Sequence, residues 1–192
     1  VTVTNAVNIV GTTAQVTAAL VTDATKVSVS DATVALDDGE TPTISQLNDI
    51  ADATDGVVTA TLAENTLANF ATLATEATDV ITVTVSDDDA VNLNAETLSA
   101  LGGKTAGTVT VTNAVNIVGT TAQVTAALVT DATKVSVSDA TVALDDGETP
   151  TISQLNDIAD ATDGVVTATL AENTLANFAT LATEATDVIT VT

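Results

Sequence analysis

Residues 109 to 192 repeat residues 1 to 84 without a change, which sets a period of 108 residues. Within each period an alternation of apolar and hydroxyl residues returns four times, and a helix-like segment follows each time. These alternations begin at Val1, Val27, Val58 and Ile81, and Val109 opens the second copy. In such an array each unit packs mainly on its neighbours, so a single large globular core is not expected.

Each unit, here termed a coil, has the pattern of a strand, a short corner, a second strand, a capped helix and a turn. The alternation from Val1 to Thr4 is typical of a strand with one buried face. Parallel strands joined through helices form right-handed crossovers. We therefore predict an α/β fold: a right-handed solenoid of strand–helix coils of about 27 residues, stacked through a parallel β-sheet, with four coils per 108-residue repeat.

The predicted boundaries follow the strand starts. The first repeat covers residues 1–108 and divides into coils 1–26, 27–57, 58–80 and 81–108. The second repeat, residues 109–192, is incomplete and divides into coils 109–134, 135–165, 166–188 and the start of the next. Coil 58–80 is short, and we expect it to lack the second strand. Both ends of the sequence lie inside strand patterns without a polar capping unit, so we expect one continuous solenoid excerpted from a longer array.

Two capping boxes predict helix starts, one at Thr12 (or Thr13) with Gln15 and one at Thr43 with Gln46. A short helix is expected within residues 65–73, and another over residues 95–101, behind Asn94 and ending at two glycines. The inward faces are expected to be Val16, Ala19, Leu20 and Ala24 in the first helix, Ile44, Leu47, Ile50 and Ala51 in the second, and Leu67, Phe70 and Leu73 in the third.

Charge and composition exclude several classes of function. The chain has 26 acidic and three basic residues and a net charge of −23, which excludes nucleic acid as a partner because phosphate binding needs Lys and Arg. No apolar run approaches the roughly 20 residues of a membrane span, so no membrane insertion is expected. His and Cys are absent, and with them the commonest general base, thiol nucleophile and transition-metal ligands. We expect no enzyme, no catalytic residue and no required cofactor.

Outward hydroxyl groups form the first candidate surface. Stacked strands would place them in rows about 4.8 Å apart, and this grid resembles the threonine faces of ice-binding solenoids. The alternative, which we prefer, is that threonine is simply a common exposed residue of β-surfaces. The ladder candidates are Thr2, Thr4, Ser28, Ser30, Thr59, Thr61, Thr82 and Thr84.

Acidic turns form the second candidate surface. Clustered carboxylates supply the oxygen ligands that Ca²⁺ prefers, although no spacing here matches an EF-hand loop. The alternative is a solvated acidic surface, and neighbouring coils would then repel one another at low salt. The candidate Ca²⁺ ligands are Asp37, Asp38, Glu40, Asp87, Asp88 and Asp89.

Two strand segments, residues 27–32 (VSVSDA) and residues 81–87 (ITVTVSD), are each followed by an Ala/Leu-rich helix. They resemble the tandem segments of very large secreted bacterial surface proteins, adhesins that are often exported with calcium-binding nonapeptide repeats. The nonapeptide Gly-Gly-x-Gly-x-Asp is absent here. The resemblance implies an extracellular stalk or filament at the cell surface rather than a catalyst.

The sequence thus predicts a structural segment of an extended extracellular fibre or stalk, whose partners are further copies of its own repeat in a homo-oligomer or filament. One alternative is an adhesin or an ice- or glycan-binding module that uses the threonine ladder or Ca²⁺-organised turns, with a surface or glycan ligand held through other domains. Another is a designed repeat protein, because perfect repetition is also typical of a constructed sequence.

Overall fold

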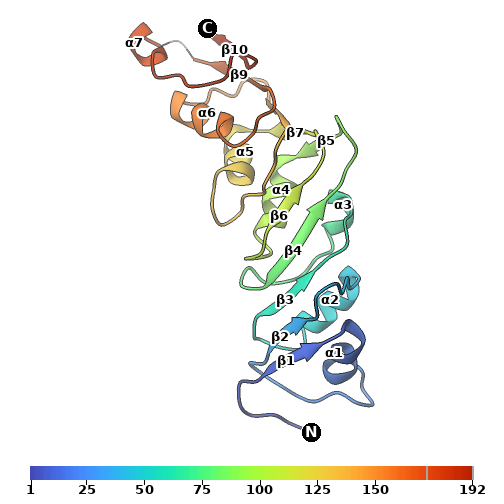
Figure 1. Cartoon of the computed structure of the whole chain (residues 1–192). Helices are drawn as coiled ribbons and strands as arrows, with labels where there is room; N and C mark the ends of the chain where they lie inside the picture. The colour runs from blue at the N-terminus through green and yellow to red at the C-terminus, as the bar shows by residue number, and fades with distance from the viewer. Residues whose placement is uncertain (172, 192) are drawn as a thin grey trace.

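A computed structural model of the chain describes residues 1–171 and 173–191; Glu172 and Thr192, both in the second copy, lie outside the described residues. Within these ranges, ten strands and seven helices alternate along an elongated body whose two termini lie at opposite ends (Figure 1). The predicted α/β class is confirmed as alternating strand–helix units that form two all-parallel five-stranded sheets.

The elements of the two copies match closely, as expected from identical sequences. The first 108 residues contain β1 (Asn8–Gly11), α1 (Thr13–Leu20), β2 (Thr33–Leu36), α2 (Ile44–Ala51), β3 (Val58–Thr61), α3 (Leu67–Phe70), β4 (Val80–Val85), β5 (Asn92–Asn94) and α4 (Ala95–Gly102). The second copy contains β6 (Val109–Val111), β7 (Asn116–Gly119), α5 (Thr121–Leu128), β8 (Thr141–Leu144), α6 (Ile152–Ala159), β9 (Val166–Leu170), α7 (Leu175–Phe178) and β10 (Val188–Val191).

The two sheets overlap where the first copy meets the second. The strand orders are β1-β2-β3-β4-β6 and β10-β9-β8-β7-β5. Strand β4 pairs with β3 through its first half and with β6 through its second, whereas β5 pairs with β7. Residues 85–108, which occur once in this sequence, are termed the joint segment. They connect one copy of residues 1–84 to the next through backbone pairing on both sheets.

The predicted helix caps are confirmed. Thr12 accepts a 3.3 Å hydrogen bond from the Gln15 N–H while the Gln15 amide oxygen accepts one of 2.9 Å from the Thr12 N–H, so Thr13 is not the cap. Thr43 and Gln46 form the same box, and Asn94 caps α4. Each of these helices spans eight residues, and among the described residues no helix is long and apolar enough to cross a membrane.

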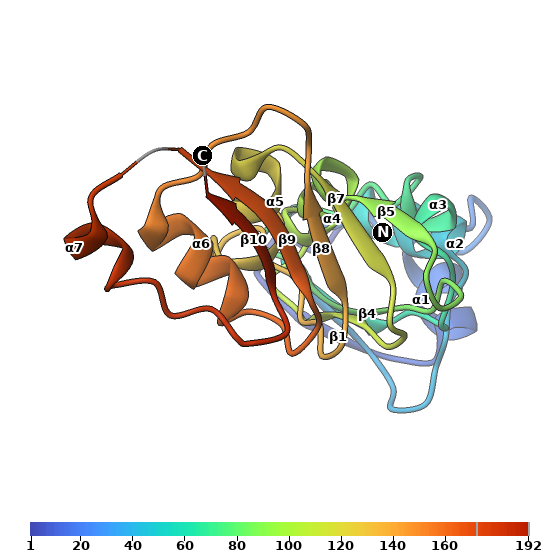
Figure 2. The same cartoon turned by 90° about the horizontal axis from the view of Figure 1, so that it is seen from above.

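The core is a thin layer between the sheets and their helices. Leu47 and Ile50 of α2 are fully buried, whereas Ile44 and Ala51 pack at its edge. The predicted third helix shrinks to the single turn of α3, although Leu67, Phe70 and Leu73 are all buried as expected. The helices lie on one side of the body from α1 to α3 and on the other from α5 to α7 (Figures 1 and 2).

One residue of the predicted inward faces is placed wrongly. Helix α1 ends at Leu20, and Ala24 lies in the turn that follows, where it is exposed. Val16 and Leu20 are buried and Ala19 packs against the core at its edge. The helix ends early because the turn folds back on it: the Val27 N–H bonds to the carbonyl of Ala19.

The strand assignment in coil 58–80 is a correction. We expected β3 to match the first strands of the other coils and the second strand to be missing. Instead β3 pairs with β2, which is the second strand of coil 27–57, and Val34 lies opposite Val58. Both valines are buried, so this register hides the apolar face of β3. The first strand is replaced by a loop in which the Asp55 N–H bonds to the Ser30 carbonyl at 2.7 Å.

Whether the predicted first strand of a coil forms regular backbone pairing depends on the segment beside it. Residues 1–4 and 27–30 meet in a single bridge between Thr2 and Ser28, not in a ladder. The identical sequence at Val109–Val111 is a strand, because β4 pairs along its length. The same four-residue pattern therefore forms a regular strand only where another strand precedes it and pairs with it.

Candidate functional site

Carboxylates from one coil cap the helices of the coil before it. The Glu40 carboxylate accepts a 2.7 Å hydrogen bond from the Thr13 N–H at the start of α1, and Glu148 makes the same bond to Thr121 in the second copy. These bonds lower the pKa of both glutamates. A negative charge at a helix N-terminus is favourable, since it meets unpaired N–H groups and the positive end of the helix dipole.

Three of the candidate Ca²⁺ ligands accept a backbone hydrogen bond from a neighbouring coil, and two of these bonds are at helix starts. Besides Glu40, Asp87 accepts a 2.7 Å bond from the Leu67 N–H, and Asp89 accepts one of 3.1 Å from the Ala114 N–H. Asp38 and Asp88 are exposed in the same turns, as is Asp37. Among the described residues, no group of three or more carboxylates lies close enough to hold one metal ion. Calcium binding at these turns stays a prediction.

The hydroxyl ladder is divided between different rows of strands. Thr2 stands beside Ser28, whereas Thr61 pairs with Thr82. Thr84 pairs with Thr110, which in turn bridges to Ser136. Thr59 has Ala35 on one side and Val80 on the other, so its row is not a hydroxyl row. The candidates other than half-buried Thr84 are exposed, namely Thr2, Thr4, Ser28, Ser30, Thr59, Thr61 and Thr82. The structure thus brings them together in pairs, not in one continuous grid.

A buried Thr-x-Gly turn, which sequence analysis did not identify, fastens the end of a coil to the segment with which that coil begins. The Thr105 hydroxyl oxygen accepts bonds from the Ile81 N–H at 2.7 Å and the Gly107 N–H at 2.8 Å. It lies 2.9 Å from the Asp79 and Ile81 carbonyls, to which it donates. A Cβ on Gly107 would lie 2.3 Å from the Ile81 carbonyl oxygen, so only glycine allows this approach.

The same turn recurs in both copies. Thr54 and Thr162 bond to carbonyls just after the first strand segment of their own coil and to the N–H of the glycine two residues later. A Cβ on Gly56 or Gly164 would lie 2.3 Å from a backbone oxygen. The signal available in the sequence was the recurrence of Thr-x-Gly before a strand at residues 54–56, 105–107 and 162–164.

Asp79 is a buried carboxylate with a structural role. Its side chain is 3% exposed and accepts bonds from the Val58 N–H at 2.8 Å and the Glu76 N–H at 2.9 Å. Asp187 makes the equivalent bonds to Val166 and Glu184. Each aspartate therefore ties the start of one strand to the loop that leads into the next.

Amide side chains also form a short ladder across the sheet at the joint segment. The Asn116 side-chain amide donates to the Asn92 side-chain oxygen at 2.7 Å, and Thr141 donates to Asn116 at 2.9 Å. This row runs from the joint segment into the second copy. It shows that outward positions of these strands are used for lateral bonds between coils.

The joint segment is bonded to the coils on both sides. Toward the first copy, the Lys104 ammonium donates to the carbonyls of Ala71 and Leu73, and Thr75 donates to the Lys104 carbonyl at 2.9 Å. Toward the second copy, α4 packs on α5 and Gly102 lies against the Thr133 backbone, where a Cβ would meet the carbonyl oxygen at 2.1 Å. The two glycines end α4 as expected: Gly103 is the C-cap, with φ −72°, and Gly102 allows the close packing.

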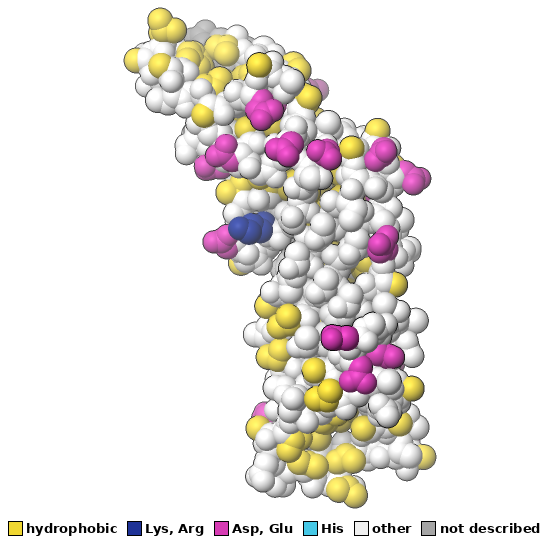
Figure 3. Space-filling view, viewed as in Figure 1, with side chains coloured by type: hydrophobic (Ala, Val, Ile, Leu, Met, Phe, Trp, Pro, Cys, Tyr) yellow, Lys and Arg dark blue, Asp and Glu magenta, His cyan; other side chains and the backbone are white. Residues whose placement is uncertain are grey.

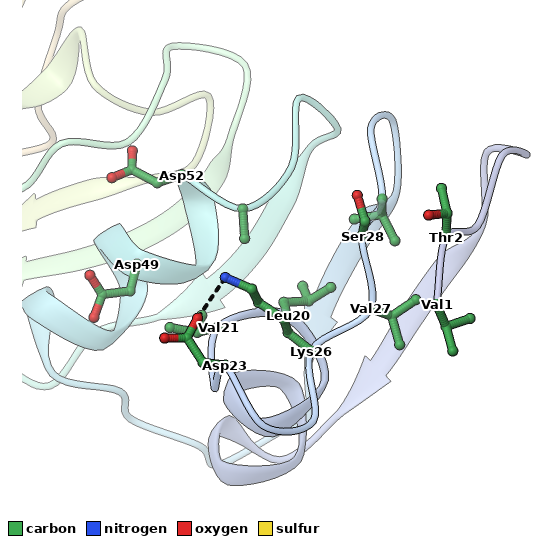
Figure 4. Close-up of a pocket in the computed structure, with 12 residues that line it drawn as sticks. Val1, Thr2, Leu20, Val21, Asp23, Lys26, Val27, Ser28, Asp49 and Asp52 are labelled. Atoms are coloured by element: carbon green, nitrogen blue, oxygen red, sulfur yellow. Dashed lines mark ion pairs between the residues drawn. The ribbon is translucent and has the colours of Figure 1, made fainter.

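A large hollow lies at the N-terminal end of the body. It has a volume of about 610 Å³ and is lined by Val1, Leu20, Val27 and the exposed ion pair of Lys26 with Asp23 (Figure 4). The equivalent hollow of the second copy has a volume of about 380 Å³ and is also lined by residues 107 and 108 of the joint segment. The hollow is therefore smaller where a coil precedes it.

Side chains are distributed unevenly on the face seen in Figure 3. Hydrophobic side chains gather at the N-terminal end and again at the C-terminal end, with acidic side chains spread between them. Exposed large apolar residues are concentrated at these ends, including Val1, Val10, Leu175 and Val191. The chain matched no protein-family model, no curated protein and no solved structure.

Proposed function

We propose that this chain is a structural segment of an extended extracellular fibre or stalk, folded as a right-handed α/β solenoid that lengthens by adding repeats. The observation that supports this most is the backbone pairing across the joint, where Val85 stands opposite Val111 and Leu93 opposite Ile117. Pairing of this kind repeats without limit, because every copy of residues 1–84 offers the same strands to the next joint segment.

The contacts between coils favour a mechanical role. Backbone bonds and anionic helix caps link one coil to its immediate neighbour, and Thr-x-Gly turns close individual coils, as in a linear array whose stability is a sum of local terms. The extracellular location rests on the acidic, cysteine-free composition and on the resemblance to secreted surface proteins.

The length of covalent arrays tests this proposal. Chains with one, two and four complete 108-residue repeats should lengthen linearly in small-angle X-ray scattering and electron microscopy. Four parallel strand steps of about 4.8 Å give roughly 20 Å per repeat. Compact particles, or a length that does not grow in proportion to repeat number, would contradict the solenoid. Antibody labelling of intact source cells tests the proposed extracellular location. A signal that appeared only after permeabilisation would contradict it.

A further inference from the structure

We propose that Asp38–Gly39 and Asp146–Gly147 are sites of spontaneous aspartate isomerisation, and that the reaction releases the helix cap formed by the glutamate that follows each pair. The product, isoaspartate, accumulates with age in one exposed turn of each copy. The reaction needs no enzyme and no partner, and it does not depend on the proposed fibre.

The chain contains four Asp-Gly pairs, the dipeptide in which aspartate isomerises most readily because glycine has no Cβ to shield its nitrogen. In the reaction, the glycine nitrogen attacks the aspartate Cγ. The N–Cγ bond forms, the N–H proton is lost, and one carboxyl oxygen leaves as water with that proton and a proton from solvent. The four pairs are at residues 38–39, 55–56, 146–147 and 163–164.

Water then opens the cyclic imide. Attack at the main-chain carbonyl breaks its bond to the glycine nitrogen, leaves that nitrogen bonded to Cγ, and returns a proton to solvent. Nothing is oxidised or reduced, and one water is released and one consumed. The net change is an isomerisation that adds one methylene group to the main chain.

Two of the pairs lie in an open turn. Asp38 and Gly39 are both exposed, and the turn is closed by a 3.1 Å bond from the Glu40 N–H to the Asp37 carbonyl. Gly39 has φ +86°, and a Cβ on it would meet no atom within 4 Å. Among the described residues, none accepts a hydrogen bond from the Gly39 N–H. The second copy repeats this turn, with φ +87° at Gly147.

The other two pairs belong to Thr-x-Gly turns, which hold the attacking nitrogen. The Gly56 N–H donates to the Thr54 hydroxyl at 3.1 Å, and the Asp55 N–H donates to the Ser30 carbonyl at 2.7 Å. The second copy has the same bonds. Asp55 is exposed, as Asp38 is, so exposure of the carboxylate does not distinguish the two kinds of turn. The hydrogen bond on the glycine nitrogen does.

Ring closure requires the Asp-Gly peptide to rotate toward the aspartate side chain. In the open turn this rotation breaks one turn bond, whereas in the Thr-x-Gly turn it must also separate two closely packed backbone segments, because a Cβ on Gly56 would lie 2.3 Å from a carbonyl oxygen. Local opening therefore costs more in the Thr-x-Gly turn. In the folded chain we expect isoaspartate to form roughly tenfold or more faster at Asp38 and Asp146 than at Asp55 and Asp163.

The position of the open turn gives the reaction a structural consequence. Glu40 follows Gly39 directly, and its carboxylate accepts the 2.7 Å bond from the Thr13 N–H at the start of α1. An added methylene lengthens the chain between the Asp37 carbonyl and the Glu40 N–H, which are bonded in the native turn. We expect an isomerised turn to lose this bond and, with it, the direction that brings Glu40 to the helix.

The test is to age the 192-residue chain at neutral pH, both folded and in urea, and to locate isoaspartate by mass spectrometry with electron-transfer fragmentation. Cleavage after glutamate separates the two kinds of pair, because Glu40 and Glu148 lie between them. In the folded chain isoaspartate should appear first in the open turns. In urea, where neither kind of turn is held, the four pairs should react at similar rates.

Adjacent aspartates supply matched variants. Asp38→Glu with Asp146→Glu keeps the charge and blocks the reaction, since the longer side chain closes its ring far more slowly. Asp37→Glu with Asp145→Glu makes the same change one residue earlier and leaves the Asp-Gly pairs intact. After equal ageing, the native chain and this control should show a lower midpoint in urea denaturation and a smaller fall of that midpoint on acidification. The blocked variant should keep both values.

Two results would overturn the site: equal isoaspartate in both kinds of turn of the folded chain, or none in the open turns while the same pairs react in urea. Isoaspartate in the open turns with unchanged midpoints would show that the cap survives, and would overturn the proposed consequence. None of these results bears on the length of covalent arrays, so the proposed function is tested separately.

Discussion

The Glu40 carboxylate reaches back 27 residues to the helix of the preceding coil and accepts a 2.7 Å hydrogen bond from the Thr13 N–H. Glu148 and Thr121 repeat this contact in the second copy. The bond joins an ionised side chain to an otherwise unpaired N–H at a helix start, and it links two consecutive coils. Stability and protonation of the array are therefore coupled through these glutamates.

The coupling predicts a pH dependence. The hydrogen bonds to Thr13 and Thr121 lower the pKa of Glu40 and Glu148 in the folded state. Their contribution is therefore present above the ordinary glutamate pKa of about 4.3 and is lost as pH falls through the lower folded-state pKa. Between about pH 7 and pH 3, the midpoint denaturant concentration should fall less for the double variant Glu40→Gln, Glu148→Gln than for the native chain. Glu64→Gln, at an exposed site, is the control; equal acid sensitivity of native chain and double variant would refute the coupling.

Leu67 and Leu175 give a comparison of one residue in two environments. Leu67 is 5% exposed under α4, and Leu175 is 87% exposed. Leu67→Ala should destabilise the chain by about 2–5 kcal/mol because it leaves a cavity, and Leu175→Ala should change stability by less than about 0.5 kcal/mol. Urea denaturation of the two variants measures this difference. Equal losses would mean that α4 does not pack on α3.

Thr105 is expected to be the most sensitive hydroxyl of the joint segment. Thr105→Val keeps the shape but leaves the buried Ile81 N–H and the partly buried Gly107 N–H without their acceptor. Each unsatisfied group costs about 1–3 kcal/mol. Thr78→Val, at an exposed site, should leave the melting temperature nearly unchanged. A similar effect of both substitutions in thermal denaturation would show that the Thr-x-Gly turn carries no stability.

Val111 tests the stacking of strands at the joint. It is 2% exposed in β6, opposite Val85 of β4. Val111→Asp buries a charge that has no partner, which costs several kcal/mol. Val3→Asp, the identical change at the half-buried counterpart, should cost much less. Unchanged melting of the Val111 variant would contradict the stacked-strand arrangement.

The net charge of −23 predicts sensitivity to ions. Carboxylates of neighbouring coils repel at low salt, because the Debye length rises from about 10 Å at 0.1 M to about 30 Å at 0.01 M. The melting temperature should therefore increase with NaCl. Screening by divalent cations does not distinguish Ca²⁺ from Mg²⁺, so the two at equal concentration should stabilise equally. A saturable effect of Ca²⁺ alone, lost in Asp87→Asn, would instead support the predicted calcium site.

Much of the local structure followed from the sequence. The capping boxes at Thr12 and Thr43, the Asn94 cap and the inward positions of Leu47, Phe70 and their neighbours depend on contacts within a few residues. The predicted strand of coil 58–80 failed because period-two alternation identifies a strand but not its partner. Val58 could stack beside Val27 or beside Val34, and both choices preserve the alternation.

The candidate sites were less predictable for the same reason. Thr59 and Ser28 occupy equivalent positions in the sequence pattern. The residues beside them in the sheet nevertheless differ, because these depend on which strands pair. Carboxylates such as Glu40 and Asp87 look like a solvated surface until the helix start of another coil is placed beside them.

By itself, the sequence determined the 108-residue period, the alternation of strands and helices, the helix caps and the acidic surface, because each depends on local periodicity or on composition. Only the tertiary structure decided which strands pair, which glycines touch another backbone, and which of two identical residues is buried. Val1 and Val109 have the same neighbours in sequence, yet one is 96% exposed and the other 3% exposed. Burial in an array depends on the coil alongside, and only the folded chain supplies that coil.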